Sequence, residues 1–417
     1  MLILRPINSH GLANNASDKR TVNRKKILKE LYFSKTLTCA DLCQKTDKSF
    51  PLITKLINEL LEEGLITETG YATSTGGRRP LTYAINKDVM YVVSIAMDQF
   101  ITRIAIMDME NNFVFPIEKF ELPLSKNPKA LPILADKIEE VILSSGISKS
   151  KILGIGIGMP GLVDVHKGIN YSFLHSTGKT ITQYIFEQIE IPVFIDNDSS
   201  LIALTELKFG AARGKKNAMV VNIGWGVGLG MIINGEIFRG SQGFAGEFSH
   251  IPLFLNGKLC SCGKSGCLET ETSLYVIIEN AIEGIRSGRL SKLSSLSNEH
   301  FEEAIDTIIA AALDGDQFAV SLFSQAGYNI GKGVAILIHL VNPEIIILSG
   351  RGSLAGKIWN APIQQAVNEH CIPRLHHNTT IEVSTIGYNA ELIGGAALVM
   401  ENCDRIVDKN YAASYQV

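Results

Sequence analysis

Four side chains with metal-ligating chemistry lie close together in the middle of the chain, at His250, Cys260, Cys262 and Cys267. Their spacing is H-x9-C-x-C-x4-C. Three thiolates and one imidazole complete the tetrahedral ligand set of zinc and leave no position open for water. Three buried free cysteines beside an unrelated histidine are the alternative, but the tight spacing and the interleaved glycines favour a metal. The pattern therefore predicts one structural Zn²⁺ per chain rather than a hydrolytic metal.

Two carboxylates, Glu247 and Glu269, bracket this cluster. A loop tied to a metal holds its neighbouring side chains in fixed positions. Fixed carboxylates accept hydrogen bonds from hydroxyl groups, so the pair suits recognition of a small molecule that is rich in hydroxyls.

The rest of the central region alternates between predicted strands and helices, and polar or glycine-rich motifs follow the strands. Strand 152–157 runs into Gly158–Asp164, and strand 193–195 ends at Asp196-Asn197-Asp198. Strands 218–223 and 228–233 flank the run Gly224–Gly230, and strand 345–348 precedes Ser349-Gly350-Arg351-Gly352. Open α/β sheets bind ligands at the carboxyl ends of their strands, so these motifs are expected to line a ligand site.

Length and composition indicate a globular protein with two or three domains, since 417 residues exceed one ordinary core. We find no apolar run of the roughly 20 residues that span a bilayer and no secretory signal. We therefore expect no membrane partner. The seven cysteines do not form a secreted disulfide pattern, which favours a reducing cytoplasm. Charge is uneven: residues 1–90 hold 14 Lys and Arg against 9 Asp and Glu, whereas the remainder holds 25 against 33. A basic first module on an acidic body suggests nucleic acid as its partner.

Residues 21–87 have the pattern of a winged helix-turn-helix. Helical periodicity begins at Val22, a second short helix begins at Thr38 with a capping box to Asp41, and a third runs from about Ser49 to Glu63. Two short strands, 65–67 and 81–85, follow as a hairpin. The alternative is a small helical packing domain with a solvated hairpin.

The third helix would enter the major groove of double-stranded DNA. Its candidate base-reading residues are Ser49, Thr54, Lys55 and Asn58. At the hairpin tip, Arg78 and Arg79 follow Gly76-Gly77 and suit contact with phosphates or the minor groove.

Taken together, these motifs resemble the ROK family of sugar kinases and repressors, in particular its DNA-binding sugar-responsive repressors. The resemblance begins near residue 20 and rests on six motifs: Gly-Gly-Arg-Arg-Pro in the wing, Gly158-Met159-Pro160-Gly161, Asp196-Asn197-Asp198, the Gly224–Gly230 run, Glu-x-x-His and Cys-x-Cys-Gly-x-x-Gly-Cys-x-Glu. It implies an α/β fold: a two-lobed actin/hexokinase-like (ribonuclease H-like) domain with sugar bound in the cleft between its lobes.

The resemblance also assigns residues. It places sugar contacts at Asn197, Asp198, Glu247, His250 and Glu269, and zinc on His250, Cys260, Cys262 and Cys267. In family kinases Asp198 would be the general base; a repressor can keep it as a hydrogen-bond acceptor.

The phosphate-binding half departs from the kinase pattern. Where family kinases carry Asp-x-Gly-x-Thr, this chain has Ala96-Met97-Asp98-Gln99-Phe100, and Trp225 replaces a small hydroxyl in the second phosphate loop. A carboxylate at Asp98 would repel phosphate. We therefore expect no catalytic residues and no enzyme activity, and interpret the glycine-rich run as a remnant of the fold.

The sequence thus predicts a flexible segment 1–20, a DNA-binding module 21–87 and a ROK domain 88–417. Lobe 1 would comprise about 88–205 plus a helix near 390–405, and lobe 2 about 206–389 with the zinc loop 247–269. The expected function is repression of carbohydrate-utilisation genes by a homodimer or homotetramer that binds operator DNA and responds to a monosaccharide or sugar phosphate. A ROK sugar kinase with a DNA-binding appendage, and a repressor controlled by a protein partner, are the alternatives.

Overall fold

The computed structural model describes residues 15–73, 79–175, 178–293, 296 and 300–406. The chain divides into two compact units, one formed by Met1–Asn197 with Leu392–Val417 and the other by Asp198–Glu391. The expected lobe boundary near 205 is therefore shifted, because helix α6 (Asp198–Phe209) packs on the strands of the second unit. Within the described residues, no helix is both long and apolar enough to cross a membrane.

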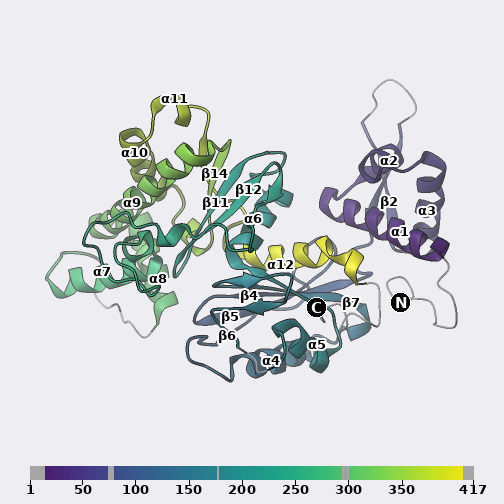
Figure 1. Ribbon diagram of the computed structural model, residues 1–417, viewed down its shortest axis with the longest axis horizontal. Helices are drawn as coiled ribbons and strands as arrows, with labels where there is room; N and C mark the ends of the chain where they lie inside the picture. Colours follow the sequence, from purple (N-terminus) through teal and green to yellow (C-terminus); the bar gives the residue numbers. More distant parts are fainter. Residues whose placement is uncertain (1–14, 74–78, 176–177, 294–295, 297–299, 407–417) are drawn as a thin grey trace. The chain divides into compact units, whose positions relative to one another are not determined.

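The first unit begins with a winged helix-turn-helix (Figure 1). Its helices are α1 (Asn15–Ser34), α2 (Cys39–Thr46) and α3 (Phe50–Glu62), and its strands are β1 (Leu37–Thr38), β2 (Ile66–Tyr71) and β3 (Leu81–Ile85), paired in the order β1-β3-β2. The predicted capping box is present: Thr38 Oγ1 accepts from Asp41 N, and Thr38 N donates to the Asp41 carboxylate.

Helix α1 starts at Asn15, whereas the sequence predicted a flexible segment through residue 20. The reason lies in distant partners. Arg20 pairs with Glu59 at 2.8 Å and Arg24 with Glu63 at 2.5 Å, which joins α1 to α3 and to its C-cap residue. Such a partner is invisible to local hydrophobic periodicity.

A five-stranded sheet follows in the first unit. Its order is β10 (Val193–Asn197), β7 (Ile152–Met159), β4 (Tyr91–Met97), β5 (Ile101–Met107) and β6 (Glu118–Glu121). Helices α4 (Ala130–Ser144) and α5 (Ile181–Ile189) lie on one face, and α12 (Ala390–Glu401) lies on the other (Figure 1). A Cβ at Gly156 would lie 2.0 Å from the Gly395 carbonyl oxygen, so glycine lets α12 pack directly on β7. The short elements β8 (Val163–Asp164), β9 (Ile169–Asn170), η1 (Lys149–Lys151) and η6 (Cys403–Arg405) complete this unit.

The second unit repeats the same sheet. Its order is β13 (Glu236–Ile237), β12 (Val227–Ile233), β11 (Ala218–Ile223), β14 (Ile345–Ser349) and β15 (Thr380–Val383). In both sheets three antiparallel strands are continued by two parallel ones. Two such sheets in one chain are the actin/hexokinase-like fold that the motifs predicted.

Helices cover the second sheet on both faces. The core against α7 (Leu274–Arg286), α8 (Phe301–Leu313), α9 (Gln317–Val341) and α10 (Asn360–His370) includes fully buried Phe323 and Trp359. The remaining elements are α11 (Pro373–His376) and the short helices η2 (Phe248–His250), η3 (Leu268–Glu271), η4 (Arg351–Trp359) and η5 (Gly387–Asn389).

Candidate functional site

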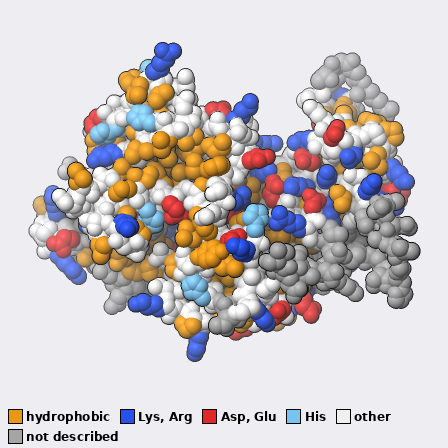
Figure 2. Space-filling view, viewed as in Figure 1, with side chains coloured by type: hydrophobic (Ala, Val, Ile, Leu, Met, Phe, Trp, Pro, Cys, Tyr) orange, Lys and Arg blue, Asp and Glu red, His pale blue; other side chains and the backbone are white. Residues whose placement is uncertain are grey.

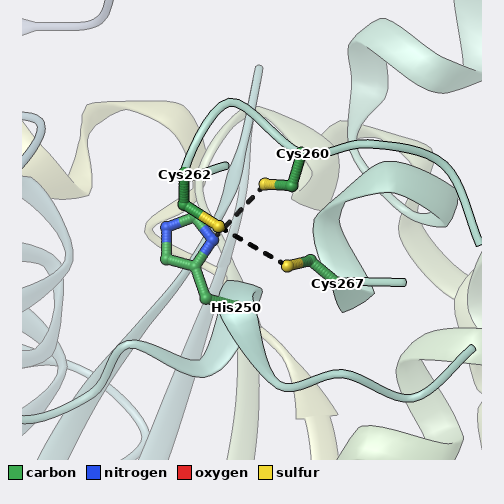
Figure 3. A group of neighbouring side chains, drawn as sticks. All are labelled: His250, Cys260, Cys262 and Cys267. Atoms are coloured by element: carbon green, nitrogen blue, oxygen red, sulfur yellow. Dashed lines mark hydrogen bonds between the residues drawn. The ribbon is translucent and has the colours of Figure 1, made fainter. Parts of the chain in front are cut away.

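The predicted zinc ligands come together in the second unit (Figure 3). The ligand atoms of His250, Cys260, Cys262 and Cys267 all lie within 4.8 Å of one another. Cys262 Sγ is 3.7 Å from Cys267 Sγ, and Cys260 Sγ is 3.5 Å from His250 Nδ1. Tetrahedral zinc with bonds of about 2.3 Å places its sulfur ligands about 3.8 Å apart. The donor set and its spacing therefore fit zinc.

Tight turns bring the three cysteines together. Gly263 N donates to Cys260 O at 2.9 Å, and Cys260 N donates to Lys264 O at 2.7 Å. Gly266 has φ +79°, and a Cβ there would lie 2.0 Å from the Phe254 carbonyl oxygen. Only glycine meets both conditions without strain.

The thiols differ in their environments. Hydrogen bonding to the Lys264 backbone lowers the pKa of exposed Cys262. Burial raises the pKa of Cys267 to about 12. Metal binding requires thiolates, so a cation at this cluster would offset the cost of ionising Cys267.

His250 faces two groups at once. Its Nδ1 points to the cysteines, whereas Nε2 lies 3.7 Å from Glu247 Oε2. The Glu247 side chain is half exposed, yet packing around its carboxyl raises its pKa; His250 opposes this shift and nearby Glu269 adds to it. The two carboxylates that bracket the cluster in sequence are therefore electrostatic neighbours in space.

Glu269 also supports the glycine-rich loop. The Val227 amide donates to Glu269 Oε2 at 3.4 Å, and a Cβ at Gly226 would lie 2.5 Å from that oxygen. The loop and the metal cluster are thus linked through one candidate sugar-binding side chain.

Asp198 is held at the first position of α6. Its Oδ1 accepts from Ser199 N at 2.7 Å, and Asn222 Nδ2 donates to its Oδ2 at 3.3 Å. Asn222 also donates to Ser199 Oγ at 3.1 Å. Sequence reasoning missed Asn222, although its place as the penultimate residue of β11, two positions before Gly224, was a usable signal.

Asn197, the remaining predicted sugar contact, ends β10 in the first unit. Its Nδ2 donates to Gly161 O at 3.2 Å, and its backbone N donates to Asp196 Oδ1 at 2.9 Å. The motifs Gly158–Gly161 and Asp196–Asp198 are therefore adjacent, as expected for the ends of two neighbouring parallel strands.

Packing explains the glycines that follow Trp225. A Cβ at Gly228 would lie 2.0 Å from Ser199 Oγ, and one at Gly230 would lie 2.4 Å from the Ser199 carbonyl oxygen. Both positions let α6 lie close to β12. The run is needed by the fold whether or not it meets phosphate.

Arg351 occupies the space beside this loop, at the carboxyl end of β14. It is 7% exposed and pairs with Glu302 at 2.5 Å and with Asp306 at 2.8 Å. Its guanidinium lies 5.7 Å from the centre of the Trp225 ring and 5.0 Å from that of Tyr388. Arg351 and its partners thus lie at the carboxyl end of β14, where open α/β sheets usually bind ligands.

The equivalent hairpin of the first unit is closed in another way. Asp98 Oδ1 accepts hydrogen bonds from the amides of Phe100 and Ile101, each at 2.7 Å. The Asp98 carboxylate thus accepts hydrogen bonds from two amides of the turn with which kinases of the family bind phosphate.

The predicted DNA-reading residues differ in exposure. Ser49, Lys55 and Asn58 are exposed, whereas Thr54 is half-buried with its Oγ1 3.5 Å from Cys39 Sγ. Ser49 occupies the N-cap of α3, but its side chain makes no capping hydrogen bond. In the wing, Arg79 is exposed, and Arg78 lies outside the described residues.

Comparisons with known proteins agree with this architecture. Residues 101–402 match the ROK family. The chain is 28% identical to a xylose repressor from Caldicellulosiruptor bescii, over 92% of this chain and 96% of that protein. It is 33% identical to a glucokinase from Halalkalibacterium halodurans, over 68% of this chain and 88% of that protein. A solved ROK family transcriptional regulator, a homologue of the E. coli MLC protein, superposes with a TM-score of 0.74 at 28% identity, covering 93% of this chain and 97% of that one.

Proposed function

The chain belongs to the ROK family, and we propose that it is a sugar-responsive transcriptional repressor of carbohydrate-utilisation genes. The observation that carries this proposal is the winged helix-turn-helix ahead of the ROK domain. The similarity to the xylose repressor extends over 92% of the chain, whereas that to the glucokinase covers 68%.

A kinase with a DNA-binding appendage is the second candidate, and retained Asp198 favours it. Two observations oppose it. The Asp98 carboxylate accepts hydrogen bonds from the amides of the first hairpin turn, and the bulky Trp225 ring lies 5.7 Å from the Arg351 guanidinium in the second phosphate loop. Because each would hinder a triphosphate by itself, we propose that the chain is not an enzyme.

For the effector, we assign a monosaccharide or sugar phosphate to Asn197, Asp198, Glu247, His250 and Glu269. Carboxylates and an amide match the donors and acceptors of sugar hydroxyls. One structural zinc would fix the loop that carries the last three of these residues. The 3.7 Å approach of His250 Nε2 to Glu247 Oε2, and the electrostatic effect of Glu269 on the pKa of Glu247, support a common site.

Sugar binding can alter DNA binding only if the sugar has different affinities for two arrangements of the protein. We propose that the repressor acts in the cytoplasm as a homodimer or homotetramer and that the sugar changes the spacing or order of its DNA-binding modules. A repressor controlled by a protein partner would lack direct sugar affinity.

The proposal is tested by selecting duplexes from a random pool with the full-length protein and measuring their affinity by fluorescence anisotropy. Isothermal titration with a panel of monosaccharides and their phosphates then identifies the effector. We expect one enriched duplex motif and one sugar that weakens binding to it. Failure to enrich any motif would refute the repressor assignment, and an enriched motif with no sugar response would favour the protein-partner alternative.

A further inference from the structure

Helix α3 presents a large apolar side chain at its first position. Phe50 is 58% exposed, and Pro51 beside it is also exposed. Single exposed apolar residues are common on protein surfaces and by themselves indicate nothing. What distinguishes Phe50 is its place in the first turn of the helix that would enter the major groove, where base contacts concentrate.

Phe50 shares its surface with the polar candidates for base reading. One shallow depression is lined by Phe50 and Pro51 together with Thr54, Lys55 and Asn58, and two glutamates of α3 lie at its far end. The phenyl ring is therefore continuous with the proposed DNA-binding face. Apolar and charged side chains are also interspersed over the winged module in Figure 2.

The charges near α3 are compatible with DNA on this face. The two glutamates that line the depression are Glu59 and Glu62. Arg20 of α1 pairs with Glu59 at 2.8 Å, and Arg24 pairs at 2.5 Å with Glu63, the C-cap of α3. Glu62 is exposed at the last position of α3, at the end of the helix opposite Phe50. The exposed Lys55 adds a positive charge on the outer surface of the helix. This face of α3 therefore carries an apolar ring beside groups that a DNA groove accepts.

Base edges in the major groove present one apolar group, the C5-methyl of thymine. Lys55 and Asn58 can read guanine and adenine by hydrogen bonds, but Thr54 is half-buried against Cys39. Phe50 is thus the side chain of this face best suited to a methyl group. We propose that Phe50 determines specificity by packing on a thymine methyl group in each operator half-site; this rests on the proposed function.

The test removes only the methyl group. The duplex most enriched from a random pool by the full-length protein is resynthesised with single thymines replaced by deoxyuridine, which keeps every hydrogen-bonding edge. For the wild type, we expect one position per half-site where the replacement weakens binding about fourfold, the factor for one buried methylene-sized group. The variant Phe50→Ala should bind thymine and uracil duplexes equally.

Two control variants make the result specific. Lys55→Ala should weaken binding to both duplexes and keep the uracil penalty, because an ammonium group does not read the thymine methyl group. Phe50→Leu should retain part of the penalty. Thermal melting should place Phe50→Ala close to the wild type, since the ring is mostly exposed.

The outcomes separate this proposal from the function on which it rests. If no duplex is enriched, the repressor assignment fails. If a duplex is enriched but uracil has no effect, or if the penalty persists in Phe50→Ala, the role of Phe50 is refuted while the repressor assignment stands. A change of oligomeric state in Phe50→Ala would show that the ring packs against a second copy, which also refutes the proposal.

Discussion

At the scale of single residues, His250 connects the metal cluster to the candidate sugar-binding carboxylates. Its Nδ1 faces Cys260 and its Nε2 faces Glu247. A metal on Nδ1 would leave Nε2 as the protonated nitrogen, which can donate toward the carboxylate. The same imidazole would then hold the metal-binding cysteines on one side and Glu247 on the other. Loss of the metal should therefore also lower the affinity for sugar.

Replacing Cys262 by Ser tests this coupling. Cys262 is exposed, so the change removes a ligand without opening the core. We expect the wild type to hold about one zinc equivalent and the variant to hold none. The variant should also melt at a lower temperature and bind the sugar at least about tenfold more weakly. Metal analysis, thermal melting and calorimetric titration measure the three effects. Cys43→Ser, outside the cluster, should change none of them; full sugar affinity in a zinc-free variant would contradict the coupling.

Trp225 and Asp98 lead to a second prediction, that the protein does not turn over Mg-ATP with common hexoses. Coupled assays of ADP release should stay far below the roughly 1–1,000 per second of typical enzymes. Trp225→Thr alone should not restore turnover, because Asp98 still occupies the amides of the first turn. Turnover in the typical range by the wild type would overturn the view that the chain is only a repressor.

At the scale of elements, helix α1 contacts two parts of the first unit, one through the residues near its start and the other through the residues near its end. Arg20 binds Glu59 of α3, and Arg24 binds Glu63, the C-cap of that helix. Farther along, Lys29 Nζ lies 2.8 Å from the carboxylate of Glu401, the last residue of α12, and Tyr32 donates to Asn111 Oδ1 at 2.5 Å. Helix α1 therefore contacts both α3 and the end of α12, and we predict that it couples a movement of one to the other.

Lys29→Met should weaken this transmission. The variant loses both the ion pair and the bond from Lys29 Nζ to the Glu401 carbonyl. Partly exposed pairs contribute only about 0–1 kcal/mol, so folding should persist. We expect near-normal operator affinity without sugar and a several-fold smaller loss of affinity with sugar, both measured by anisotropy. Lys137→Met, which breaks the pair with Glu140 on α4, is the matched control. An unchanged sugar effect in Lys29→Met would exclude this route.

Sequence reasoning located elements whose signals are local. The capping box of α2 and the limits of β11 follow from neighbouring residues, and the structure has both as predicted. It could not find partners far away in the chain. Arg351 binds Glu302 and Asp306, which lie 49 and 45 positions earlier, and Gly228 is required by a serine of α6. Both depend on tertiary packing, which no local pattern encodes.

At the scale of the whole molecule, charge is divided between a basic DNA-binding module and an acidic remainder. The paired arginines of the wing should contribute affinity without selectivity, because phosphate contacts carry no base information. Replacing Arg78 and Arg79 by Ala should weaken operator and random duplexes alike and reduce the slope of log affinity against log salt by about two. Asn58→Ala should instead reduce the difference in binding free energy between operator and random DNA by about 1–3 kcal/mol. If the arginine variant lost affinity for the operator but not for random duplexes, the assignment of non-selective affinity to the wing would be contradicted.

The symmetry of the operator is the remaining prediction. A two-fold oligomer presents two copies of α3, so the bound sequence should be a pseudo-palindrome. Its half-site centres should be about 10–10.5 base pairs apart or a multiple of that spacing, so that both helices meet the major groove on one face of the duplex. Footprinting on the enriched duplex, with the mass of the complex from analytical ultracentrifugation, measures both properties. Inserting five base pairs between the half-sites should abolish tight binding, whereas inserting ten should restore part of it. A single asymmetric half-site bound by one chain would refute the proposed oligomer. It would also refute the mechanism in which sugar controls the spacing of the two modules.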